Sequence, residues 1–158
     1  MPIAETNDSN LIKEIETKRG AKVGYRTVST FYADSQGNIC DLGVFLYECQ
    51  DSLWYEDFEP EASIFGFKIQ TKAKSKYVKF EGSFRMEDVV SVRRVLKRAA
   101  RRCACGERSF AGLRAAGVVS GFLCAVVTEF VLRDGRRLYF ELIDNSVIDI
   151  IKKHSKVM

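Results

Sequence analysis

Histidine is nearly absent from this sequence of 158 residues, in which His154 is the only one. Nucleophilic catalysis by serine or cysteine usually needs an imidazole as the neighbouring base. His154 lies in the basic stretch KKHSK near the end of the chain, where we expect a surface position at a helix terminus. The carboxylates of EDFEPE (56–61) crowd one segment, which we interpret as a solvated acidic loop. The sequence therefore predicts no catalytic residues and a protein that is not an enzyme.

A phosphate-binding loop and a long apolar run are also missing. GLRAAGVVSG (112–121) contains glycines but lacks the lysine and the spacing of a phosphate loop. The longest apolar run, Ala115 to Thr128, is shorter than the roughly 18 residues of a membrane helix, and we expect it to form a buried strand. The start of the chain lacks the regions of a signal peptide. We therefore expect a cytoplasmic protein with a single domain over residues 1–158, of which residues 1–10 are flexible.

The five cysteines do not have the spacing of a zinc site. Cys103 and Cys105 form a C-x-C pair without a second pair nearby, whereas structural zinc sites usually contain C-x₂-C pairs. Neighbouring arginines would lower the pKa of both thiols, so redox behaviour and metal binding stay open as alternatives to incidental thiols. An odd cysteine count also favours a reducing compartment. The sequence predicts no metal and no cofactor.

Alternating β-branched and aromatic residues predict most of the fold. Strands are expected at 23–32 and 39–48 (a hairpin around DSQGN), at 52–58, at 63–70 and 76–84 (a second hairpin), and at 122–132 and 137–143 (a third). The Asp134-Gly135 pair favours a type I′ turn in the third hairpin. Helices are expected over 9–20 and 144–153. The predicted class is α+β: a mostly antiparallel sheet or partly closed β-barrel of about seven strands, with a C-terminal helix and one basic helix.

The basic helix is expected over residues 86–102. Val89, Val92 and Leu96 recur at helical spacing. Acidic residues precede this stretch and arginines end it, which suits the helix dipole. A strand over 89–96 is the alternative, because VVSVRRV is rich in β-branched residues.

Positive charge is concentrated in the middle of the chain. Residues 1–67 carry 5 basic and 12 acidic side chains, whereas residues 68–114 carry 14 basic and 4 acidic ones. The candidate binding residues are lysines and arginines of this middle part: Arg93, Arg94, Lys97, Arg98, Arg101, Arg102, Lys74 and Lys76. The alternative is a solvated face that pairs with the acidic first third.

This basic face predicts a non-catalytic binding or adaptor module that acts through protein–protein contacts. The expected partner is an acidic protein, and an anionic membrane or a nucleic acid is the alternative. No sequence signature of a nucleic-acid-binding fold is present.

The segment from YVKFEGSFRMEDVVSV to FVLRDGRRLYFELIDNSVIDIIKK resembles the PH-like superfamily, in its bacterial PH and GRAM-type versions. The similarity lies in the Glu87-Asp88-Val89 step after a strand, the strand pair around Asp134-Gly135 and the terminal helix, and it covers about half of the chain. It implies a barrel of two orthogonal sheets with a helix plugging one end. Residues 97–121 would be a long insertion, and a helix over 86–102 departs from the family's order.

Overall fold

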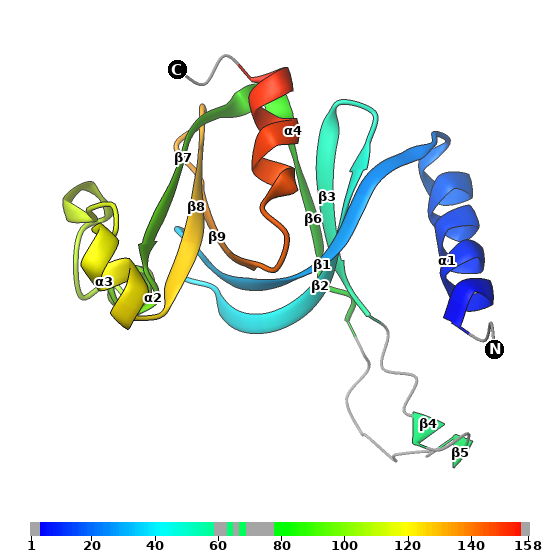
Figure 1. Cartoon of the computed structure of the whole chain (residues 1–158), viewed down its shortest axis with the longest axis horizontal. Coiled ribbons are helices and arrows are strands. Elements are labelled where there is room, and N and C mark those ends of the chain that lie inside the picture. Colours follow the sequence, from blue (N-terminus) through cyan, green and yellow to red (C-terminus); the bar gives the residue numbers. More distant parts are fainter. Residues whose placement is uncertain (1–3, 59–62, 65–66, 69–77, 156–158) are drawn as a thin grey trace.

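A curled antiparallel sheet forms the centre of the molecule (Figure 1). The computed structural model describes residues 4–58, 63–64, 67–68 and 78–155, with side chains from Ser9 to Phe58 and from Val78 to Ser155. The strands are β1 (Val23–Asp34), β2 (Ile39–Cys49), β3 (Ser52–Asp57), β4 (Ser63–Ile64), β5 (Phe67–Lys68), β6 (Glu81–Arg85), β7 (Val89–Leu96), β8 (Val126–Leu132) and β9 (Arg137–Leu142). The helices are α1 (Ala4–Arg19), α2 (Lys97–Ala104), α3 (Val118–Leu123) and α4 (Ser146–His154), with the 3₁₀ turns η1 (Met86–Asp88) and η2 (Phe110–Gly112).

Seven of these strands make one sheet in the order β6-β3-β2-β1-β9-β8-β7, in which every neighbouring pair is antiparallel. Its two edge strands, β6 and β7, follow each other in the chain and are joined by η1. The sheet therefore curls into a half-barrel, and the chain has the predicted α+β class with a C-terminal helix (Figure 1).

The main core fills the concave side of the sheet. Phe31 of β1 stacks on Tyr55 of β3 with ring centroids 5.3 Å apart, and it meets Phe140 of β9 edge-on at 5.3 Å. Helix α4 adds Val147 and Ile151 to this cluster, and both are fully buried. Burying aromatic and branched side chains from strands of both halves of the sheet stabilises the curl.

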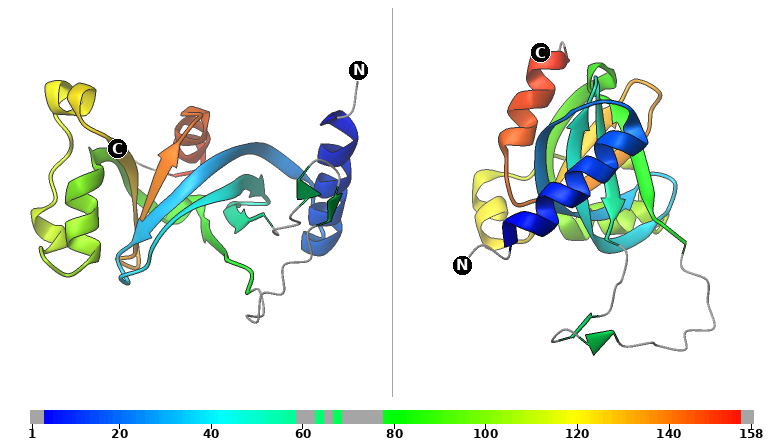
Figure 2. Two further views of the ribbon diagram at one scale, coloured as in Figure 1. Left: turned by 90° about the horizontal axis from the view of Figure 1, so that it is seen from below. Right: turned by 90° about the vertical axis from the view of Figure 1, so that its right-hand side faces the viewer.

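Two smaller clusters cover the convex side. Helix α2 and η2 pack over β1, β7, β8 and β9, where Cys103 and Ala100 lie against Tyr139. Helix α1 packs Ile15 against Tyr47 and Cys49 of β2. Helix α1 and the α2–α3 region thus lie at opposite ends of the long axis, as the views in Figures 1 and 2 agree.

The predicted helix over 86–102 is wrong for most of its length. Residues 89–96 form β7, which pairs with β8 in a register that places Val92 opposite Phe130 and Val95 opposite Val127. The strand alternative is therefore correct. The hydrogen bonds and side-chain contacts that these residues form with β8 stabilise a strand more than the helical spacing of their valines favours a helix. A basic helix exists, but it begins at Lys97 and ends at Ala104.

The second predicted hairpin is also wrong where the structure describes it. Strand β6 pairs with β3, opposite Trp54 and its neighbours, whereas β4 pairs with β5. Much of the expected 63–70 and 76–84 pair lies outside the described residues, as do Lys74 and Lys76. The first helix begins at Ala4, so residues 4–10 belong to α1.

The apolar run at 115–128 does not form one buried strand. Its middle is helix α3, and strand β8 begins only at Val126. The turn between β8 and β9 is not of type I′, since Gly135 has a φ of +88° but Asp134 does not have a positive φ. Instead the Asp134 carboxylate accepts a hydrogen bond from the backbone N–H of Arg136 at 3.0 Å.

Candidate functional site

The connection between β7 and β8 forms a separate lobe, residues 97–125, that contains α2, η2 and α3 (Figure 1). We call it the β7–β8 lobe. Phe110 anchors it by stacking on Tyr139 with centroids 6.1 Å apart. Ala116 N donates to Arg94 O at 2.7 Å, and Leu113 is buried in the convex cluster. These contacts hold the lobe against the end of the sheet.

Three of the predicted binding cations are engaged within the chain. Arg93 Nε donates to Glu129 Oε1 at 2.6 Å. Lys97 Nζ bonds to Glu141 and lies 3.6 Å from Asp41 Oδ1. Arg102 Nε donates to Glu107 Oε2 at 3.0 Å. All three cations are only partly exposed. They pair within the chain, but of their partners only Asp41 belongs to the acidic first third that the alternative named.

Five other arginines of this region are exposed and form no ion pair among the residues that the structure describes: Arg94, Arg98, Arg101, Arg108 and Arg114. Arg98 and Arg101 are one helical turn apart on α2, on the side opposite the buried Ala100 and Cys103. Arg94 lies on β7 and lines a groove under α3. The predicted basic face is thus divided between a strand and a helix and is smaller than the sequence indicates.

Helix α3 presents an apolar surface to solvent that the sequence does not predict. Its four large side chains are 93%, 72%, 89% and 74% exposed, for Val118, Val119, Phe122 and Leu123 respectively. Soluble proteins rarely expose contiguous apolar side chains to this extent outside interaction sites. The glycines at 117 and 121 interrupt the run and are the signal that one strand does not span it.

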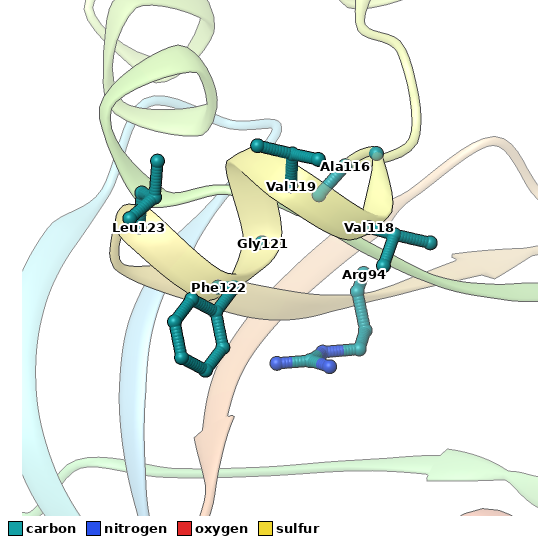
Figure 3. Close-up of a pocket in the computed structure, with 8 residues that line it drawn as sticks. Arg94, Ala116, Val118, Val119, Gly121, Phe122 and Leu123 are labelled. Carbon is teal, nitrogen blue, oxygen red and sulfur yellow. The ribbon is translucent and has the colours of Figure 1, made fainter.

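A groove of about 690 Å³ separates α3 from Arg94. Figure 3 shows the Arg94 side chain extending beneath α3, with Val118 and Phe122 on the same side of the helix. Strand β7 and helix α3 together place one exposed cation directly beside apolar walls. A group with both a carboxylate and an apolar part fits such a surface.

Cys103 behaves differently from the expectation of an acidic thiol. All five cysteines are free, and Cys103 is buried with its Sγ 3.6 Å from Ser109 O. Burial raises the pKa of the Cys103 thiol, because desolvation outweighs the nearby arginines. Cys105 is exposed on the far side of the helix end. Within the described residues no three metal-ligating side chains converge.

The other singled-out side chains have structural positions. His154 is exposed at the end of α4, as predicted, with Nε2 3.4 Å from Glu48 Oε1. Glu56 is not in a solvated loop but is 5% exposed on β3, where Lys18, Arg19 and Lys79 surround it.

In comparisons with known proteins, no family model, no curated protein and no solved structure matches the chain. Among the described residues, no helix has the length and apolar character needed to cross a membrane. The fold and the lobe therefore define an α+β half-barrel with an exposed apolar and basic surface.

Proposed function

We propose that the chain is a non-catalytic binding module that docks on an acidic protein partner through the β7–β8 lobe. The observation that carries this proposal is the exposed apolar surface of α3 beside the unpaired Arg94. The partner would cover Val118 and Phe122 with apolar side chains and place a carboxylate on Arg94. Arg98 and Arg101 would then meet further acidic groups at the rim, where charges mainly set orientation and association rate.

The composition of the two grooves of the β7–β8 lobe supports a binding role over catalysis at this site. The groove under α3 and the neighbouring groove beside α2 are lined by apolar residues, arginines, serines and Cys103. Among the residues that the structure describes, neither lining contains a carboxylate or an imidazole. General acid–base chemistry needs such a group within reach of the substrate.

We further propose that the fold is PH-like, with the β7–β8 lobe as an insertion. The strands of the main sheet follow each other in the chain as β1, β2, β3, β6, β7, β8 and β9, and the terminal helix α4 comes after them. Helix α4 contacts η1, the turn that joins the two edge strands β6 and β7. A helix over 86–102 would have departed from the family's order of elements, but residues 89–96 form strand β7 instead. A reducing compartment such as the cytoplasm suits the five free thiols.

An anionic membrane is the second candidate, because the apolar sector of α3 lies beside exposed arginines. The groove favours a protein partner instead. A bilayer would cover the outer side chains of α3 and offer no carboxylate that is placed specifically for Arg94.

The test compares the wild type with three variants of the full chain as bait in pull-downs at low and high salt. One carries Arg94→Glu, Arg98→Glu and Arg101→Glu, and a second carries Phe122→Ser and Leu123→Ser. The control carries Lys13→Glu, Arg26→Glu and Lys152→Glu, which reverses the same number of exposed charges outside the lobe. Circular dichroism checks that all forms fold.

We expect one defined protein to bind the wild type and the control at both salt concentrations and to be lost from both lobe variants. Binding to anionic vesicles or to duplex DNA is measured in parallel. Retention of the same protein by the arginine variant would contradict the proposed surface. Binding to vesicles or DNA that falls steeply with salt, without a protein partner, would replace the proposed partner class.

A further inference from the structure

A second groove, of about 580 Å³, lies in the β7–β8 lobe next to the groove under α3. It is lined by α2, by the segment from Arg108 to Ala116 and by Ser120 of α3. Its floor is apolar and comes from Leu96, Ala99, Cys103 and Leu113. Its volume is within the range of roughly 300–1,000 Å³ that is typical of sites for small molecules.

The walls of this groove are fixed before any ligand arrives. Phe110 stacks on Tyr139, and Ser109 Oγ accepts from Ala111 N at 3.2 Å at the start of η2. Leu113 is buried, and the bond from Ala116 N to Arg94 O ties the far end of the segment to β7. A preformed wall lowers the entropy that binding must offset.

Two arginines give the groove its charge. Arg108 and Arg114 both line it and are exposed, and neither forms an ion pair among the described residues. The lining contains no carboxylate. Two unpaired guanidinium groups beside an apolar floor are complementary to a molecule that has an anionic head and an apolar tail.

We propose that this groove binds one single-chain amphiphile, whose carboxylate or phosphate head pairs with Arg108 and Arg114 and whose alkyl tail covers Leu96, Ala99 and Cys103. This groove shares Ala116 with the groove under α3 and is also lined by Ser120 of that helix, but its two arginines, Arg108 and Arg114, are not part of the proposed docking surface. Arg98 belongs to the rim of the proposed docking surface but lies outside the lining of this groove. Replacing Arg98 therefore tests docking without touching the amphiphile site.

The test titrates the full chain with decanoate and with decyl phosphate, each below its micelle concentration, by isothermal titration calorimetry. The two probes distinguish a carboxylate from a phosphate source. Decanol supplies the tail alone, and acetate and inorganic phosphate supply the heads alone. We expect one equivalent of at least one anionic amphiphile to bind, and the tail and head probes to bind at least about tenfold more weakly.

Variants locate the binding in this groove. Arg108→Gln with Arg114→Gln should weaken binding about tenfold or more. Ala115→Trp, at an exposed lining position, should block the tail. Arg98→Gln, the matched control on α2, should bind like the wild type. Equal binding by the double arginine variant, or no binding of either anionic amphiphile to the wild type, would overturn the proposal.

Cys103 supplies an independent readout. Its Sγ lies in the groove lining and is buried, whereas Cys105 and Cys124 are exposed and outside the lining. Bound decanoate or decyl phosphate should slow alkylation of Cys103 several-fold and leave Cys105 and Cys124 unchanged, as measured by mass spectrometry of peptides. Uniform slowing of all three thiols would contradict binding in the groove.

Discussion

Arg93 of β7 and Glu129 of β8 face each other as partners in the sheet register, and Arg93 Nε donates to Glu129 Oε1 at 2.6 Å. Glu129 is fully buried and also accepts from Tyr139 Oη at 2.8 Å and from Arg137 Nη1 at 3.2 Å. One carboxylate thus connects β7 and β9 through the strand between them. A buried carboxylate with three donors is stable only while these partners stay in place.

Replacing Glu129 by alanine should strongly destabilise the sheet. The change leaves Arg93 and Arg137 without their buried acceptor, and loss of one member of a buried pair typically costs about 3–5 kcal/mol. Urea unfolding measures this free energy. Glu107→Ala is the control, because its pair with Arg102 is solvent-exposed and should contribute less than about 1 kcal/mol. Equal losses in the two variants would contradict the role of Glu129.

Alkaline pH should destabilise the domain through its tyrosines. Burial, followed by the hydrogen bond to Asp144, raises the pKa of Tyr25 to about 12. Burial also raises the pKa values of Tyr139 and Tyr55. Unfolded tyrosine has a pKa of about 10, so above that pH the unfolded chain releases protons that the folded one keeps. The stabilisation that these tyrosines contribute is therefore fully present below about pH 10, and the free energy of unfolding declines from there toward about pH 12.

The measurement is the urea midpoint as a function of pH, from neutral pH to about pH 11.5. Tyr25→Phe should reduce the decline without removing it, because the other buried tyrosines still titrate. A midpoint that stays constant through this range would show that the tyrosines ionise equally in both states.

Arg19 should determine how firmly α1 is held on the sheet. Its guanidinium lies 3.5 Å above the Trp54 ring centroid, and it also bonds to Tyr47 Oη at 3.1 Å and Glu56 Oε2 at 3.3 Å. Arg19→Ala should cost about 2 kcal/mol and change the fluorescence of Trp54, the only tryptophan. Lys22→Ala is the control, since Lys22 is 92% exposed and pairs only with Glu16 among the described residues. Unchanged fluorescence in Arg19→Ala would contradict the stacking.

Gly82 on β6 should tolerate no side chain. A Cβ at this position would overlap the Tyr55 ring, which is held in place by stacking on Phe31. We expect Gly82→Ala to lower the free energy of unfolding by about 1–3 kcal/mol. Gly43→Ala on β2 has open space around its Cβ and is the matched control for a glycine in a strand. A neutral Gly82→Ala would mean that Tyr55 can move aside.

The sequence predicts the parts of the fold that depend on local chemistry. The turn at residues 35–38 follows from Asp, Asn and Gly. Before α4 the Asp144 carboxylate accepts from Ser146 N at 2.9 Å, whereas Asn145, the N-cap residue, makes no side-chain cap hydrogen bond. The strands that β-branched and aromatic residues favour are present in β1, β2, β3 and β9. These signals involve neighbours in the chain, which sequence patterns record well.

The errors concern residues whose structure depends on distant partners. Residues 89–96 show helical spacing of valines, but pairing with β8 makes them a strand. The acidic residues that pair with the predicted basic face lie far along the chain, as Glu129 and Glu141 do, so Arg93 and Lys97 could not be recognised as engaged. The exposure of α3 could not be predicted from the sequence either. An apolar run by itself predicts burial, and only the three-dimensional structure shows that none of the other described elements covers it.

The chain enters the β7–β8 lobe at Lys97 and leaves it at Ala125, and a backbone hydrogen bond of 2.9 Å from Lys97 N to Ala125 O joins these two points. The entropy of closing such a loop rises only slowly with its length. Gene recombination can therefore exchange the residues in between as a cassette, provided that the new segment again covers Tyr139 and Val127. In evolution the half-barrel and the sequence of the lobe can then diverge at separate rates.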